Sequence, residues 1–343
     1  GASDIIMDPN NPEILFAGFW EMVIWTWGRQ SGGPGSGLFV SRDGGDSWER
    51  LEGHGLPEPP LGKVVLGISP DDSDRIYALI ETNSNREFAP LDQHQGVLWR
   101  SDDGGYSWRM VNADHTLVQR PHYYSRVVVA PDDRDEVHFL ATAHTTSLDG
   151  GLSVRRGSAG GDNHDMWIDP LQPDRMIVGN DGGVHISTNR GESWLRPRMP
   201  IAQMYHVYTD NQIPYFVYGN RQDGASHRGP SNSLSGGTIP IGEWHSVGGC
   251  ESGFAIPDPV DNNIVWSGCY EGILDRYDLR TGHSRNVSVW PDNPEGWPAG
   301  ELRYRFQWTF PIVFDPHDPD VLYTTSQHVW RTTSGGQSWE RIS

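Results

Sequence analysis

The sequence predicts an all-β protein built from repeated antiparallel sheets. Three observations carry this prediction: a short turn motif recurs along the 343 residues, apolar strands precede each copy in the same succession, and Gly (41) and Trp (15) are abundant. Glycine-rich turns and many aromatic residues suit short, packed strands. The length exceeds that of an average domain, but all-β folds often reach it as single units.

The clearest repeat is an eight-residue motif, which we call the box turn. It has the form Ser/Thr-x-Asp/Asn/Ser-x-Gly-x-Ser-Trp, with Val in place of Trp in one copy, and it occupies residues 41–48, 101–108, 147–154, 187–194 and 332–339. Glycine supplies the positive φ of a tight turn, the carboxylate can accept backbone hydrogen bonds, and the Trp can pack between sheets. We therefore assign the box residues a structural role.

Apolar strands flank each box turn. In the second repeat they are expected at 64–69, 75–80, 97–100 and 107–111. Four antiparallel strands in a unit of about 40–60 residues have the size of a propeller blade. An Asp/Pro/Asn turn between the first two strands recurs seven times. The sequence therefore predicts one all-β domain over 1–343, a single seven-bladed β-propeller, with blades at about 4–52, 63–112, 124–158, 164–197, 203–248, 251–289 and 306–343.

The charge balance excludes some partners. With 26 basic and 45 acidic side chains, the net charge is −19. Such a chain repels phosphate backbones and anionic lipid surfaces, so we expect neither a nucleic-acid nor a membrane partner. The sequence also lacks an apolar run of about 18 residues, the length that a membrane-spanning helix needs.

The box turns match the Asp-box (BNR) repeat signature. The chain as a whole resembles bacterial sortilin-like and family 74-like proteins labelled as glycosyl hydrolases, through segments 35–38, 161–164, 179–184 and 219–224. The resemblance implies a secreted or periplasmic protein whose partner is a polysaccharide or oligosaccharide. In such relatives one propeller often lies beside a second, so a second propeller domain is a further expected partner. No cofactor is implied.

In a propeller with this strand order, the box turns lie on one face and the remaining loops lie on the other, which we call the loop face. Flat aromatic rings can stack on the apolar faces of sugars, and polar groups beside them can fix orientation. The residues that we predict to bind substrate on the loop face are Trp25, Trp27, Tyr124, His164, Arg221, Glu271, Arg305 and Trp308. The alternatives are an aromatic loop that covers a blade edge and a polar network that lines the channel.

Two carboxylates are the candidate catalytic residues, Asp181 and Asp223. Both follow the second strand of a blade, and Asp181 lies in an Asn-Asp-Gly-Gly turn near the position of an essential Asp in family 74 enzymes. That turn lacks one spacer residue of the family pattern, and a plain turn has the same composition. Glycoside hydrolysis needs a protonated general acid and a second carboxylate as base or nucleophile. We therefore predict a hydrolase.

Three other functions stay open at this point. A non-catalytic propeller would use the Trp-rich segment 19–29 to bind a protein, a peptide or a glycan. A polysaccharide lyase would use His as base beside Tyr124. A metal-dependent enzyme would use the His-rich loop face, although no His pair has the spacing typical of a metal site.

The two cysteines, Cys250 and Cys269, are expected at the start of the first strand and the end of the second strand of one blade. These strand ends are neighbours, so a disulfide is geometrically allowed and would indicate an oxidising compartment. Two free thiols are the alternative.

Overall fold

The computed structural model describes residues 1–25, 28–82, 96–199, 201–292 and 297–343. Within these ranges the chain is all-β, as predicted, with 3₁₀ turns as its only helical elements. It divides into two compact units, Gly1–Arg198 and Met199–Ser343, each of which we describe separately. In the described part of the chain, no helix has the length and apolar character needed to cross a membrane.

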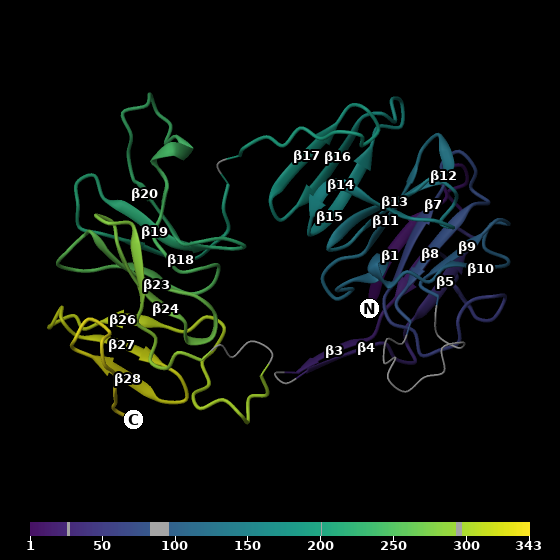
Figure 1. The fold of residues 1–343 in the computed structure, drawn as a ribbon. Coiled ribbons are helices and arrows are strands. Elements are labelled where there is room, and N and C mark those ends of the chain that lie inside the picture. Colours follow the sequence, from purple (N-terminus) through teal and green to yellow (C-terminus); the bar gives the residue numbers. More distant parts are fainter. Residues whose placement is uncertain (26–27, 83–95, 200, 293–296) are drawn as a thin grey trace. The chain divides into compact units, whose positions relative to one another are not determined.

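The first unit contains four antiparallel sheets, each made of strands consecutive in sequence apart from one inserted hairpin (Figure 1). Sheet 1 consists of β1 (Ala2–Met7), β2 (Leu15–Phe19), β5 (Gly37–Ser41) and β6 (Glu49–Leu51). Sheet 2 consists of β7 (Val64–Ile68), β8 (Ile76–Ile80), β9 (Leu98–Ser101) and β10 (Arg109–Asn112). Sheet 3 consists of β11 (Arg126–Ala130), β12 (Asp133–Leu140), β13 (Ala143–Ser147) and β14 (Arg155–Gly161), and sheet 4 of β15 (Asn163–Ile168), β16 (Met176–Asn180) and β17 (Gly183–Ser187).

The second unit contains three sheets of the same kind, each with four antiparallel strands. Sheet 5 consists of β18 (Met204–Thr209), β19 (Phe216–Arg221), β20 (His227–Pro230) and β21 (His245–Ser246). Sheet 6 consists of β22 (Ala255–Pro257), β23 (Ile264–Gly268), β24 (Leu274–Asp278) and β25 (His283–Asn286). Sheet 7 consists of β26 (Ile312–Phe314), β27 (Leu322–Thr325), β28 (Val329–Thr332) and β29 (Glu340–Arg341).

Successive sheets pack through their faces, with their first strands as neighbours. In the first unit β1 contacts β7, β7 contacts β11, and β11 contacts β15, and in the second unit β18 contacts β22. Each apolar core cluster joins two successive sheets of one unit. This stacking of four-stranded meanders is the blade arrangement of propeller folds.

The strands of sheet 2 show how the sequence produces this stacking. On β7, Val64 and Leu66 pack into the cluster shared with sheet 1, whereas Val65 packs into the cluster shared with sheet 3. Successive side chains of a strand point to opposite faces, so a run of apolar residues buries both faces. Consecutive apolar residues therefore mark a sheet that lies between two others.

Hydrogen bonds within the box turn hold the third and fourth strands together. In the second copy, the Ser101 hydroxyl accepts a hydrogen bond from the buried Gly105 amide (2.9 Å) and donates one to Asp103 (2.8 Å). The Asp103 carboxylate accepts the Ser107 amide (2.8 Å) and hydroxyl (2.6 Å). Gly104 and Gly105 have φ of 69° and 85°, as the motif predicts. The box residues therefore have the structural role assigned from sequence.

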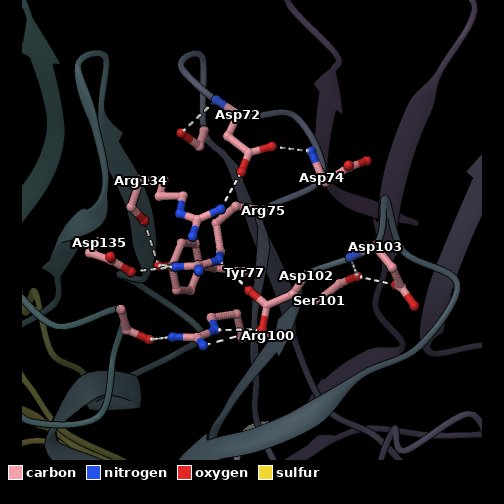
Figure 2. Close-up of polar contacts among 12 residues, drawn as sticks. Asp72, Asp74, Arg75, Tyr77, Arg100, Ser101, Asp102, Asp103, Arg134 and Asp135 are labelled. Carbon is pink, nitrogen blue, oxygen red and sulfur yellow. Dashed lines mark hydrogen bonds and ion pairs between the residues drawn. The ribbon is translucent and has the colours of Figure 1, made fainter.

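A polar network joins the box-turn ends of sheets 2 and 3. Figure 2 shows Arg75 between the carboxylates of Asp102 and Asp135, which belong to these two sheets, at 2.5 Å from each. Its side chain is only 5% exposed, and its Nη1 also donates to the Tyr77 hydroxyl (3.1 Å). Tyr77 in turn donates to the Arg134 carbonyl (2.7 Å). Because the buried charge has two anionic partners, it links the sheets at this end.

Two features differ from the sequence predictions. Sheet 4 has three strands, and its box turn is followed only by a bridge between Ile186 and Leu195. The Trp-rich segment, which we expected as a loop, contains a hairpin of β3 (Met22–Trp25) and β4 (Gly28–Ser31) that extends away from sheets 1–4 in Figure 1. Ser31 ends the hairpin and is followed by Gly32, whose φ of 94° allows this excursion between β2 and β5.

We expect Ser101→Ala to lower the free energy of unfolding by about 1–3 kcal/mol, because the buried Gly105 amide loses its acceptor. The matched control is Ser107→Ala, which removes an exposed hydroxyl from the same turn and should cost less. Guanidinium chloride unfolding followed by tryptophan fluorescence measures both. Equal losses in the two variants would contradict the role given to the buried amide.

Candidate functional site

The second unit brings carboxylates and aromatic rings together at the ends of its sheets opposite the box turn. We call this group the Glu251 cluster; it consists of Tyr205, Gln222, Asp223, Glu251, Tyr270 and Trp308. Tyr205 lies at the start of the first strand of sheet 5, and the other members precede the first strand or follow the second strand of sheets 5, 6 and 7. In an antiparallel meander these two strand ends lie at the same edge, which is why residues distant in sequence meet there.

The centre of the cluster is a pair of carboxyl groups, those of Asp223 and Glu251, which are bridged by the Gln222 side-chain amide. The Asp223 amide donates to Glu251 Oε2 (2.9 Å), and Gln222 Nε2 donates to the same oxygen (2.7 Å) and to Asp223 Oδ1 (3.1 Å). Tyr205 donates its hydroxyl to Gln222 Oε1 and so fixes the amide that bridges both acids. The site can therefore hold a proton between two carboxylates.

Burial raises the pKa of Glu251 above its usual value, and the side chain of Asp223 raises it further through its hydrogen bond and negative charge. The backbone amide of Asp223 and the Tyr270 side chain oppose this shift of the pKa only in part. Two nearby carboxyl groups resist ionising together, so one of them stays protonated at a higher pH than an isolated acid. Glu251 therefore has the properties of a proton donor.

Tyr270 and Trp308 form an aromatic surface beside the two acids. Their ring centroids lie 4.3 Å apart with an angle of 36° between the planes, and Trp308 is 43% exposed. The Trp308 carbonyl accepts hydrogen bonds from the Ser252 hydroxyl (2.8 Å) and the Glu271 amide (3.4 Å). These bonds tie the Trp308 loop of sheet 7 to the loops of sheet 6.

A disulfide between Cys250 and Cys269 positions the cluster, with a Cα–Cα distance of 4.6 Å. Glu251 and Tyr270 directly follow the two cysteines, so the bond fixes the acid and the aromatic ring relative to one another. Glu271, next in the chain, has φ of 52°, and Asp223 has φ of 55°. Non-glycine residues in this left-handed region cost conformational energy and concentrate at functional sites.

The sequence reasoning found only part of this cluster. Asp223 and Trp308 belong to it, and Glu271 borders it, but Glu251 and Tyr270 were missed. Their positions directly after the two cysteines are the signal that could have revealed them. Arg221 ends β19, and its guanidinium lies against Gly224, which follows Asp223. Arg305 is exposed, and its backbone amide donates to Gln327 (2.7 Å).

A second group, the His164 cluster, lies at the corresponding end of the first unit and consists of Arg120, Tyr123, Tyr124, Asp162, His164 and Asp181. It unites three predicted residues, Tyr124, His164 and Asp181. His164 Nε2 lies 2.5 Å from Asp181 Oδ1, and the rings of Tyr124 and His164 are 5.2 Å apart. The Tyr124 hydroxyl donates to Asp162 (2.6 Å).

In this cluster Asp181 fixes the orientation of His164, and Asp162 changes the pKa of Tyr124. The Asp181 carboxylate, 18% exposed, orients an imidazole that is 42% exposed. Burial and the bonded Asp162 carboxylate raise the pKa of Tyr124 well above its usual value. A phenol with a raised pKa stays protonated and donates hydrogen bonds. The lyase alternative, in which a His is the base beside Tyr124, stays a prediction. The catalytic role of Asp181 stays a prediction.

A pocket of about 690 Å³ adjoins the His164 cluster in the first unit. It is lined by β4, by the segments that precede β7 and β11, and by the end of β8. Arg29 Nη1 lies 2.5 Å from His122 Nε2, and burial together with the Arg29 charge lowers the pKa of His122, so its imidazole is neutral. Glu81 accepts hydrogen bonds from the Ser31 hydroxyl and the Lys63 amide (3.0 Å).

The Trp-rich hairpin borders this pocket through β4. Trp25, on the paired strand β3, is 41% exposed, and its role in substrate binding stays a prediction. Trp27 lies outside the described residues. In the described ranges, no group of three or more His, Cys, Asp or Glu side chains is arranged to hold a metal ion.

Comparisons with known proteins give resemblances of structure only. No family model and no curated protein matches the sequence. The chain is similar to the GH74 enzyme of Niastella koreensis (TM-score 0.42, 15% identity, covering 98% of this chain and 53% of that one). It is also similar to the GH74 xyloglucanase of Xanthomonas campestris (0.41, 14%, 100% and 45%). A third resemblance is to YCF48 bound to D1 peptide (0.37, 12%, 95% and 88%). The chain thus spans about half the length of the two GH74 structures.

We expect Asp223→Asn to lower the pKa of Glu251, because the substitution removes the negative charge that favours its protonated form. Carbon-13 NMR titration of glutamate carboxyl groups measures the shift, and Glu251→Gln assigns the resonance. Asp258→Asn, in a turn at the opposite end of sheet 6, is the control and should leave the Glu251 titration unchanged. A Glu251 pKa that is unaffected by Asp223→Asn would refute the coupling of the two acids.

Proposed function

We propose that this protein binds a polysaccharide or oligosaccharide at the Glu251 cluster and hydrolyses it, with Glu251 as the general acid. The observation that carries the proposal is the pair of carboxyl groups bridged by Gln222 beside an exposed aromatic surface. A glycosidic oxygen needs a proton as its bond breaks, and an acid with a raised pKa supplies that proton near neutral pH.

Asp223 then acts on Glu251 and not across the scissile bond. The two carboxylates of a glycosidase lie about 5 Å or more apart, to leave room for the sugar or for water. The Gln222 amide lies between Asp223 and Glu251 and donates to both (3.1 and 2.7 Å), so the two acids flank a side chain of the protein and not a sugar. Asp223 therefore keeps the acid protonated, and a separate carboxylate must serve as base or nucleophile. Glu271, which directly follows Tyr270 in the sequence, is the candidate for that second carboxylate.

Tyr270 and Trp308 would hold the sugar. An exposed ring surface buries the C–H face of a pyranose, while the carboxyl groups at its edge hydrogen-bond the hydroxyls. The disulfide keeps this platform and the acid in a fixed relation, which favours productive orientation. A disulfide also suits an oxidising compartment, so we propose that the protein acts in the periplasm or outside the cell.

A non-catalytic binding module is the second candidate function. Its support comes from the β3–β4 hairpin, where Val23, Ile24 and Trp25 are 45%, 70% and 41% exposed. Large apolar side chains grouped on an exposed hairpin are typical of protein-binding surfaces. Under this function the carboxyl pair would bind a ligand without turnover.

We further propose that the seven sheets are the blades of one closed β-propeller. In each unit the box tryptophans lie against the preceding sheet: Trp108 packs with sheet 1, and Trp339 donates to the Val287 carbonyl (2.8 Å). Trp48 of sheet 1 is 40% exposed. A closed ring gives every sheet two neighbours.

Small-angle X-ray scattering tests closure. A compact chain of 343 residues has a radius of gyration of about 20 Å. We expect this value at both low and high ionic strength, since closure buries apolar surface that salt does not release. A clearly larger and elongated particle would contradict the closed ring.

We expect Glu251→Gln to reduce hydrolysis of the natural polymer by about 10²–10⁴-fold, the usual contribution of a general acid. Turnover is measured by mass spectrometry of products from xyloglucan, β-glucans and xylan. The loss of activity should be much smaller on nitrophenyl glycosides, whose leaving group needs little protonation.

Trp308→Ala should instead weaken substrate binding. Asp223→Asn should move the alkaline limb of the pH–activity profile to lower pH, because it lowers the pKa of Glu251.

Glu301→Gln, an exposed carboxylate in the same unit, is the control and should retain full activity. Circular dichroism checks that each variant is folded. Full activity of Glu251→Gln on the polymer would refute the general-acid assignment. Binding of a glycan with no product from any substrate would favour the non-catalytic module.

A further inference from the structure

The pocket beside the His164 cluster has no part in the function proposed above, and we call it the Arg29 pocket. Its volume of about 690 Å³ is within the range of sites for small molecules. It is formed by β4, the segments that precede β7 and β11, and the end of β8. Connections within and between sheets 1, 2 and 3 therefore make its walls, at the ends of these sheets opposite the box turns.

Side-chain hydrogen bonds hold the β4 wall in place. Ser31, the last residue of β4, accepts a hydrogen bond from the Trp20 indole (2.9 Å) and donates one to Glu81 Oε2. The Lys63 amide donates to the same carboxylate oxygen (3.0 Å). Gly62 leaves room for this oxygen, since a Cβ there would lie 2.3 Å from it. The other oxygen of the half-buried Glu81, Oε1, accepts no hydrogen bond from the residues that the structure describes.

Two exposed arginines line the pocket, and part of each guanidinium group is unpaired. Arg29 Nη1 donates to His122 Nε2 (2.5 Å), and Arg29 forms no ion pair within the described ranges. Arg120 Nη1 lies 3.4 Å from the Tyr124 hydroxyl and 3.9 Å from Asp162 Oδ1. The remaining nitrogens of both groups have no hydrogen bond in the described part of the chain, so they can donate to a ligand.

The position of Arg120 is strongly constrained. Its φ is 50°, in the left-handed region that non-glycine residues occupy at an energetic cost and mainly at functional sites. Its guanidinium lies over the rings of Tyr123 and Tyr124, 5.3 and 5.2 Å from their centroids. Stacking on aromatic rings holds the planar group in one orientation. Less conformational freedom is therefore lost when this guanidinium binds a ligand.

His122 supplies a third donor beside the arginines. A guanidinium can only donate, so His122 Nε2 accepts from Arg29 and the proton of the neutral ring is on Nδ1. Burial lowers the pKa of His122, and the charges of Arg29, Arg120 and Lys63 lower it further. All the charges that shift this pKa are positive, which marks a position that favours an anion. The Nδ1–H has no partner among the described residues.

The charges on the pocket walls match a singly charged anion. Arg29 and Arg120 contribute two positive charges and Glu81 contributes one negative charge, so one positive charge is in excess while His122 is neutral. This local excess contrasts with the net charge of −19 of the whole chain. A carboxylate carries a single charge at neutral pH, whereas a phosphate monoester carries about −1.5 to −2. The balance therefore favours a carboxylate.

We propose that the Arg29 pocket is a second ligand site, separate from the Glu251 cluster, which binds an acidic sugar through its carboxylate. The carboxylate accepts hydrogen bonds from Arg29, Arg120 and His122 Nδ1, and a sugar hydroxyl donates to Glu81 Oε1. The ligand class is thus the uronic acid unit of a glycan. Glu81 gives the site its preference for a sugar, because a simple carboxylate has no hydroxyl to offer and is repelled by the acid.

The test uses the full chain, labelled with nitrogen-15 at histidine and titrated with glucuronate. We expect the His122 resonances, assigned with His122→Gln, to move saturably. Four further probes each lack one feature of the ligand: glucose, acetate, N-acetylalanine as the carboxylate of a peptide end, and glucose 6-phosphate. Each should bind at least tenfold more weakly. No movement of the His122 resonances with glucuronate, or equally tight binding of any other probe, would overturn the proposal.

Variants test the individual contacts by calorimetry. Arg29→Gln and Arg120→Gln should each weaken glucuronate binding at least tenfold. Glu81→Gln should bring the affinities for glucuronate and acetate closer together, because acetate gains from the loss of the negative charge. Arg155→Gln, an exposed arginine on β14 outside the pocket, is the control and should leave the affinity unchanged.

A second control separates this site from the proposed hydrolysis. Glu251→Gln should leave the His122 titration with glucuronate unchanged, whatever its effect on turnover. Circular dichroism checks the fold of every variant. Unaltered glucuronate affinity in both Arg29→Gln and Arg120→Gln would overturn the assignment of the pocket.

Discussion

The box turn closes on a buried hydroxyl that accepts the amide of the motif's second glycine, as Ser101 accepts Gly105. This bond orders the third and fourth strands of a sheet without any contribution from its opposite end. Loops at that opposite end therefore need not stabilise the sheet, and they can differ from one sheet to the next. The His164 cluster occupies such loops of sheets 3 and 4, and Trp308 of the Glu251 cluster lies in the corresponding loop of sheet 7.

The contacts between sheets follow a second constraint, which is burial on both faces. Most interfaces between successive sheets are apolar, as the alternation of β7 between two clusters shows. The interface of sheets 3 and 4 departs from this rule, because Glu136, His138 and His144 occupy positions that an apolar core could fill. Burying such groups is costly unless each is satisfied. In this interface the Glu136 carboxylate is satisfied by His138 (3.0 Å) and Arg190 (2.6 Å).

The candidate acid depends on contacts among three sheets. Glu251 precedes the first strand of sheet 6, Asp223 follows the second strand of sheet 5, and Trp308 precedes sheet 7. The disulfide between Cys250 and Cys269 ties the loops of sheet 6 together at the point where these three elements meet. The pKa of Glu251 therefore depends on the packed structure, because residues outside its own loop both bury it and supply the neighbouring Asp223 carboxylate.

The amino-acid sequence by itself determined the all-β class, the repeated strands and the structural role of the box residues. These features follow from local rules: glycine conformation, hydrogen bonds within eight residues, and the period of apolar side chains. It also placed Tyr124, His164 and Asp181 at one end of the sheets. Only the tertiary structure decided that Glu251 lies beside Asp223 and that the cysteines are joined. Those outcomes depend on burial and on partners 28 and 19 positions away, whose distances no local pattern in the sequence encodes.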